Sequence, residues 1–149
     1  MRIYPDTSFL ISWLYAPDLN HAKAWAWFRP RAGEDWVITP WTELETINSL
    51  RQLCVRSPGP RPSQIEAVRR LFKHLFNAGP LKRQAVDWFD AMTDCHQISA
   101  AFATRQKCRA ADTLHVALLE QVSADVFVSG DQEQVDLASA RGYRAVRFC

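Results

Sequence analysis

Short apolar runs that end at a polar or acidic residue alternate along the chain with longer stretches whose apolar residues recur at helical spacing. Runs of strand length lie at residues 2–5, 36–39, 126–129 and 144–148, with a weaker one at 81–86. Helical periodicity predicts helices over roughly 7–15, 20–28, 40–54, 64–76, 88–102, 109–119 and 134–140. Strands that alternate with helices call for a mainly parallel sheet covered by helices on both faces. The pattern therefore predicts an α/β fold.

The predicted helix at 64–76 is amphipathic. Its inward positions are all apolar: Ile65, Val68, Leu71, Phe72, Leu75 and Phe76. Its outward positions include three basic residues, Arg69, Arg70 and Lys73. This helix therefore presents positive charge to solvent.

The length and composition are those of a globular protein with one domain. A chain of 149 residues, spanning 1–149 as one domain, is large enough to bury a full core. No apolar run reaches the length of a membrane span, and the N-terminus lacks the pattern of a signal peptide. The four cysteines fit no CxxC or Cys/His metal spacing. We expect reduced thiols in a cytoplasmic protein.

Charge is distributed unevenly along the chain. The segment from Arg51 to Arg83 contains eight basic residues and one acid, Glu66. Its charge is +7, which leaves −5 for the rest of a chain whose formal net charge is +2. A basic segment beside an acidic remainder favours an anionic partner next to an acidic, metal-binding centre. The alternative is a solvated helix face beside a basic loop.

Two predicted strands end in an acid, and two further acids lie near the starts of helices. Asp6 follows the first strand and Asp131 follows the strand at 126–129, while Glu45 and Asp112 lie near helix starts. The carboxyl ends of strands in an open α/β sheet are where sites form. Four converging carboxylates require a compensating charge, and oxygen donors favour Mg²⁺ or Mn²⁺. The alternative for Asp6 is a helix N-cap, and Thr7 or Ser8 could start the helix while Asp6 faces a metal.

Four motifs follow one another along the chain: Asp6-Thr7-Ser8; Thr39-Pro40 followed by Glu45 and Asn48; Ala111-Asp112-Thr113-Leu114-His115; and Ser129-Gly130-Asp131 ending at Gly142. In this order they resemble the motifs of the PIN-domain family, and in particular of the VapC-type ribonuclease toxins. The resemblance covers nearly the whole chain. The resemblance implies a three-layer α/β/α sandwich with a central, mainly parallel sheet.

Carried over by position, the resemblance implies four catalytic acids: Asp6, Glu45, Asp112 and Asp131. Asp6, Asp112 and Asp131 would hold the metal. Glu45 is preferred over Glu43 because Asn48 completes the family's E-x-x-N spacing.

Supporting roles follow for small hydroxyls and one histidine. Ser8 or Thr7 resembles the hydroxyl near the metal, and Ser129 is a second such candidate. His115 follows Asp112 by one helical turn and so shares its face, although a half-buried structural histidine is the commoner case. Pro5 and the Ser129-Gly130-Asp131 sequence depart from the family pattern without removing a carboxylate.

The implied activity is that of a Mg²⁺-dependent endoribonuclease that cleaves single-stranded or structured RNA and leaves a 5′-phosphate and a 3′-hydroxyl. Basic residues of the Arg51–Arg83 segment would contact the RNA backbone. They are Arg51, Arg56, Arg69, Arg70 and Lys73. The alternative is a PIN-like module that binds RNA or protein without cutting. A DNA flap nuclease is disfavoured by the small size of the chain.

The VapC resemblance also implies a cognate antitoxin as partner. Trp13, Trp25, Trp27 and Trp41 lie in apolar helices that could form the surface of a homodimer or bind an antitoxin helix. The alternative is that most of these tryptophans belong to the core.

Overall fold

The computed structural model describes all 149 residues and contains one five-stranded sheet in which every pairing is parallel. The strand order is β3-β2-β1-β4-β5, so the first strand of the chain is the central one. The strands are β1 (Arg2–Pro5), β2 (Asp35–Ile38), β3 (Leu81–Arg83), β4 (Val126–Ser129) and β5 (Ala145–Arg147). Each lies where the apolar runs predicted a strand, although β3 is shorter than its run.

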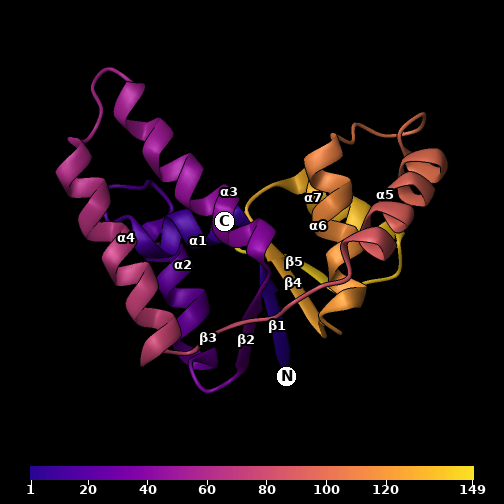
Figure 1. Cartoon of the computed structure of the whole chain (residues 1–149), viewed down its shortest axis with the longest axis horizontal. Coiled ribbons are helices and arrows are strands. Elements are labelled where there is room, and N and C mark those ends of the chain that lie inside the picture. The colour runs from indigo at the N-terminus through magenta and orange to yellow at the C-terminus, as the bar shows by residue number, and fades with distance from the viewer.

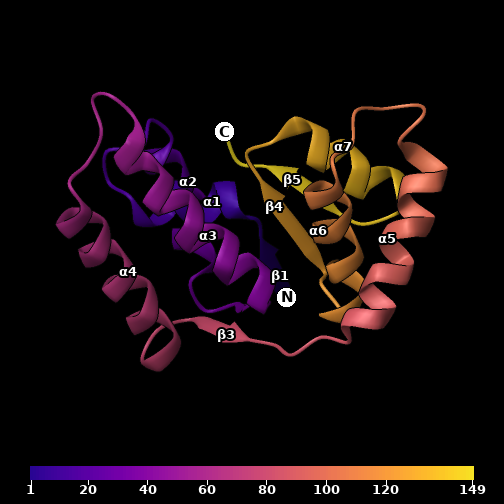
Figure 2. The ribbon, with the colours of Figure 1, turned by 45° about the horizontal axis from the view of Figure 1, so that its top comes forward.

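Seven α-helices cover the two faces of this sheet. They are α1 (Thr7–Leu14), α2 (His21–Phe28), α3 (Pro40–Gln52), α4 (Pro62–Asn77), α5 (Trp88–Phe102), α6 (Ala110–Gln121) and α7 (Gln132–Ala140). Helices α1 to α4 lie on one side of the sheet and α5 to α7 on the other (Figure 1). The turned view in Figure 2 shows the same two groups. The three-layer α/β/α fold predicted from the sequence is confirmed.

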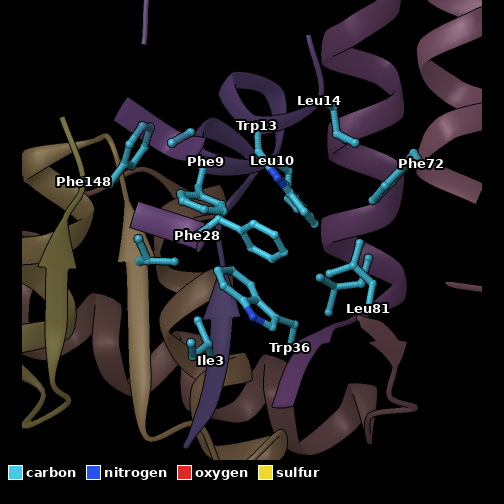
Figure 3. Close-up of a cluster of buried hydrophobic side chains, with 13 residues drawn as sticks. Ile3, Phe9, Leu10, Trp13, Leu14, Phe28, Trp36, Phe72, Leu81 and Phe148 are labelled. Carbon is cyan, nitrogen blue, oxygen red and sulfur yellow. The ribbon is translucent and has the colours of Figure 1, made fainter. Parts of the chain in front are cut away.

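Alternate residues of the strands supply two separate hydrophobic cores. Ile3 and Trp36 point to the side of α1, α2 and α4, whereas Tyr4 and Val37 point to the side of α5, α6 and α7. The first core is rich in aromatic rings, and Figure 3 shows Phe9, Phe28 and Trp36 gathered above the strands. Phe9 and Trp36 stack with their ring centroids 5.5 Å apart.

The tryptophans of the N-terminal helices contribute to these cores. Trp13 is buried within the first core, and Trp25 and Trp27 are partly buried and pack against it. Trp41, at the start of α3, packs against the second core. All four tryptophans therefore contribute to the cores of the single chain, and Trp13 alone of them is buried, whereas the other three are partly buried.

Pro5 lies in the central strand at a point where no donor is required. Asp6 N–H donates to Val128 O of β4 (3.0 Å). Because N–H groups alternate sides along a strand, the missing Pro5 donor faces β2, whose register with β1 ends at the Ile3–Trp36 pair.

One inward assignment in α4 was wrong. Leu71 is 47% exposed, because the helix buries Ile65 and Phe72 most deeply and Leu71 lies between the buried and the basic faces.

None of the helices combines the length and apolar character needed to cross a bilayer. All four cysteines are free thiols.

Candidate functional site

The four predicted acids lie at the carboxyl edge of the sheet, each in or next to the N-terminal part of a helix. Asp6 follows β1 and is the N-cap of α1, and Asp131 follows β4 and is the N-cap of α7. Asp112 is in the first turn of α6, and Glu45 follows in α3, which begins just after β2. Parallel strands end at the same edge, so the fold brings four segments of the chain together.

Asp6 is the most deeply placed of the four acids, with 1% of its surface exposed. Its carboxylate accepts hydrogen bonds from Phe9 N (2.8 Å), from Ser8 Oγ (2.8 Å to each oxygen) and from Ser129 Oγ (2.7 Å). Burial raises the pKa of Asp6, and the charge of His115 and these hydrogen bonds offset that rise only in part. Asp6 is thus a helix cap whose ionised form is disfavoured by its surroundings.

Glu45 is held by two residues on different elements. Thr7 Oγ1 donates to Glu45 Oε2, and His115 Nε2 lies 2.6 Å from the same oxygen. Oε1 has no hydrogen-bond partner within the protein. Burial acts to raise the pKa of Glu45, but the hydrogen bond and charge of His115, together with Thr7, outweigh it, so this pKa is lowered. Glu45 is therefore ionised at neutral pH.

Glu43, the neighbouring acid of α3, makes different contacts. Its two oxygens accept from Arg83 Nε (2.6 Å) and Nη2 (2.8 Å) in a bidentate ion pair at the surface. Glu45 alone of the two contacts other residues of the candidate site.

His115 is fully buried and connects Glu45 to the second core. A carboxylate only accepts, so the Nε2–H of His115 donates to Glu45. Its Nδ1 lies 3.2 Å from the hydroxyl of Tyr4, which in turn lies 2.5 Å from Thr42 Oγ1. Burial raises the pKa of Tyr4, which keeps this hydroxyl protonated. This series of hydrogen bonds, from Thr42 through Tyr4 and His115 to Glu45, fixes the orientation of the imidazole and of the carboxylate.

Asp112 and Asp131 are anchored mainly by backbone groups. Asp112 Oδ2 accepts from Arg109 N (2.8 Å), and Oδ1 accepts from the side-chain amide of Gln134 (3.0 Å). Asp131 Oδ1 accepts from Glu133 N (2.8 Å). Ser129 joins this half of the site to Asp6, because its hydroxyl donates to Asp6 and accepts from Asp131 N (2.9 Å).

A cavity of about 600 Å³ opens beside one of these acids, Asp131, and is also lined by Ser8, Gly130, Arg56 and Ser49. Position 130 has no room for a side chain, since a Cβ there would lie 2.9 Å from the ring of Phe148. The cavity is large enough for a phosphate group with its attached sugar.

The five predicted RNA-binding residues do not share one location. Arg56 lines the cavity beside Asp131. Arg51 and Arg69 line a different cavity between α3 and α4, where Arg69 forms a bidentate ion pair with Glu66. Arg70 and Lys73 are exposed on α4. Only Arg56 thus joins the acids.

The donor chemistry of the site fits a hard divalent cation. All four acids offer carboxylate oxygens, the ligands that Mg²⁺ and Mn²⁺ prefer. No group of three or more His, Cys, Asp or Glu side chains is already arranged to hold a metal ion. Hydroxyl groups occupy both oxygens of Asp6, so a cation would replace Ser8 or Ser129 as its partner.

Sequence reasoning missed Tyr4, Thr42 and Gln134 at this site. None belongs to the four motifs, and the short run at residues 2–5 predicted only that Tyr4 lies in a strand. Their partners lie far away in the sequence, which left no local signal.

The sequence matches the model of the PIN domain family over residues 3–140. The chain therefore belongs to the PIN domain family, as its motifs suggested. A comparison with curated proteins gives no match.

Solved structures share this fold over nearly their whole length. FitAcB from Neisseria gonorrhoeae has a TM-score of 0.70 at 19% identity, covering 97% of this chain and 96% of its own. The sarcin–ricin loop cleaving toxin VapC20 from Mycobacterium tuberculosis has a TM-score of 0.69 at 16% identity, covering 97% and 98%. Promoter-bound VapBC2 from Rickettsia felis has a TM-score of 0.72 at 9% identity, covering 100% of both chains.

Proposed function

We propose that this protein is a Mg²⁺-dependent endoribonuclease and the toxin of a toxin–antitoxin pair. The carrying observation is the set of four acids at one sheet edge, where Ser129 connects Asp6 with the backbone of Asp131, and Thr7 and His115 hold Glu45. Membership of the PIN domain family and the fold shared with a toxin described as cleaving the sarcin–ricin loop support this proposal.

In this proposal Asp6, Asp112 and Asp131 hold the cation, with Mn²⁺ as a substitute. A divalent ion supplies a lowered pKa for bound water and offsets charge on the scissile phosphate. Glu45 keeps Oε1 free and is ionised, so it can accept a proton from the attacking water. Thr7 and His115 hold Glu45 in place for that transfer.

The substrate backbone enters the cavity beside Asp131, where Arg56 is the available cation. The other basic residues bind flanking phosphates at longer range, since Arg70 and Lys73 are exposed on α4 and Arg69 is paired with Glu66. Arg56→Ala should therefore weaken RNA binding and cleavage more than Arg70→Ala does.

An antitoxin chain completes the proposal. Neighbours of this fold include VapBC2, a toxin–antitoxin complex by its name, bound to promoter DNA. A homodimer of the toxin is part of the same proposal. Co-expression with a short upstream open reading frame, followed by size-exclusion chromatography with light scattering, measures both associations.

The nuclease proposal is tested by incubating a single-stranded RNA and a stem-loop RNA with the protein in Mg²⁺ or in EDTA. Asp112→Asn is the inactivating variant, and Glu43→Gln is the matched control because Glu43 pairs with Arg83 outside the site. Cleavage should require Mg²⁺ and Asp112 and should survive in the control. RNA left equally intact by all three proteins, yet retained in a filter-binding assay, would favour the non-catalytic binding module instead.

A further inference from the structure

Gln134 makes the only hydrogen bond that joins Asp112 to another element. It lies in the first turn of α7 and is 9% exposed, and its Nε2 donates to Asp112 Oδ1 (3.0 Å). The other oxygen of Asp112 is bonded to Arg109 N at the start of its own helix. The position of this carboxylate relative to Asp131, the cap of α7, is therefore set through Gln134.

The same amide leaves one buried acceptor unpaired. Gln134 Oε1 is buried and has no hydrogen-bond partner. The orientation of the amide is not interchangeable, because an ionised Asp112 only accepts and so must face the NH₂ group. A buried acceptor without a partner is unfavourable, and native proteins seldom keep one without a ligand, a water or a functional reason.

Waters bound to a divalent cation direct their lone pairs at the metal and act only as donors. They need acceptors around them, and residues that hold the ligands and accept from these waters tune metal affinity. Gln134 combines both properties beside one acid, since Nε2 orients Asp112 while the buried Oε1 has no hydrogen-bond partner.

We propose that Gln134 is a positioning residue of the cation site, which holds Asp112 through Nε2 and accepts a hydrogen bond from a cation-bound water through Oε1. The inference rests on the proposed metal-dependent function and adds a residue outside the family motifs.

The test is the Mg²⁺ affinity of Gln134→Met, measured by isothermal titration calorimetry on the RNA-free protein, with Mn²⁺ as a second probe. Methionine keeps the volume and removes both polar groups. Affinity should fall roughly 10- to 100-fold, as for other residues that support metal ligands. Gln97→Met, at an exposed position of α5, is the matched control and should bind as the wild type does.

A second readout separates positioning from plain packing. Cleavage by Gln134→Met should be low at limiting Mg²⁺ and should approach the wild-type kcat at saturating Mg²⁺. If Gln134→Met does not fold, Gln134→Asn gives the same comparison, because it withdraws the amide from Asp112 by one methylene.

Gln134 variants that bind Mg²⁺ as tightly as a wild type that itself binds and cleaves would overturn the role of Gln134 alone. A wild type that binds neither cation would overturn the proposed function together with this inference.

Discussion

The four acids of the site form two regions that differ in burial and in free acceptor atoms. The inner pair, Asp6 and Asp112, is 1% and 6% exposed, and hydrogen bonds reach both oxygens of each carboxylate. The outer pair, Glu45 and Asp131, is partly exposed, and each keeps one oxygen without a partner in the protein.

This difference in burial and in free oxygens separates cation binding from action on substrate and water. The inner pair is fixed by caps and hydroxyls, and the raised pKa of Asp6 shows that its negative charge lacks compensation within the chain. In the outer pair the pKa of Glu45 is lowered, and Glu45 and Asp131 each keep one oxygen without a partner in the protein. A cation would therefore stabilise the inner region most, whereas the outer region is free to act on substrate and water.

The largest effect is expected from the inner pair. Asp6→Asn should reduce RNA cleavage on the order of 1,000-fold, comparable to the loss of a main electrostatic group in an active site. Cleavage is measured with a fluorogenic RNA at saturating Mg²⁺. The circular dichroism spectrum should not change, since asparagine can still accept from Phe9 N and its amide can pair with Ser8. An Asp6→Asn enzyme with near wild-type activity would remove the inner pair from the chemistry.

A smaller effect is expected when the support of the outer pair is removed. His115→Gln retains a donor near Glu45 but loses the contact with Tyr4, so Glu45 is held less firmly. Cleavage should fall roughly 10- to 100-fold, in kcat more than in KM. Glu45→Gln should lower kcat further, because the proton acceptor itself is lost. A fall in kcat that is matched by an equal loss of folded protein in circular dichroism would point to unfolding instead of positioning, because unfolded enzyme lowers the apparent kcat and leaves KM unchanged.

Asp6 and Glu45, one acid from each region, should respond to pH in opposite directions in the metal-free protein. The native pKa of Asp6 is raised above its ordinary value of 3.8, so the native state binds more protons and stability falls as pH rises through that window. The pKa of Glu45 is lowered from 4.5, so its stabilising contribution is present above that value and is lost as pH falls. Urea titrations in EDTA across pH 3 to 8 measure the free energy of unfolding over both pH ranges.

Variants show which residue causes each pH dependence of stability. Asp6→Asn should flatten the loss of stability on the rising side, and Glu45→Gln should flatten the loss on the acidic side. A shared pH profile for both variants and the wild type would contradict the contrast between the two regions.

The fold could be predicted because its signals are local. Apolar runs of four residues, Pro40 at the start of α3 and Gly142 after the end of α7 are each readable within a few positions. The structure adds that Ile3 and Trp36 face one core while Tyr4 and Val37 face the other, which the apolar runs did not assign. Leu71 escaped the same reasoning because periodicity alone does not locate the edge of a buried face.

The supporting contacts of the site could not be predicted, because they join residues that are distant in sequence. Tyr4 and His115 are 111 positions apart, and Gln134 and Asp112 are 22 apart. Charge counts also treated the basic residues as one group, whereas only Arg56 lines the cavity beside Asp131. Motif spacing identifies which acids to examine, and tertiary packing decides which side chains hold them.

The smallest effect is expected at Glu43, two residues from Glu45 and outside both regions. Glu43→Gln breaks the bidentate pair with Arg83, whose guanidinium remains 4.8 Å from the ring centroid of Phe76. An exposed ion pair of this kind contributes about 0.2–1 kcal/mol, so the free energy of unfolding should fall by no more than that in low salt and by less in 1 M NaCl. Urea unfolding at both salt concentrations measures the change, and RNA cleavage should match the wild type. A loss of activity as large as that of Glu45→Gln would show that the two acids of α3 had been assigned in the wrong order.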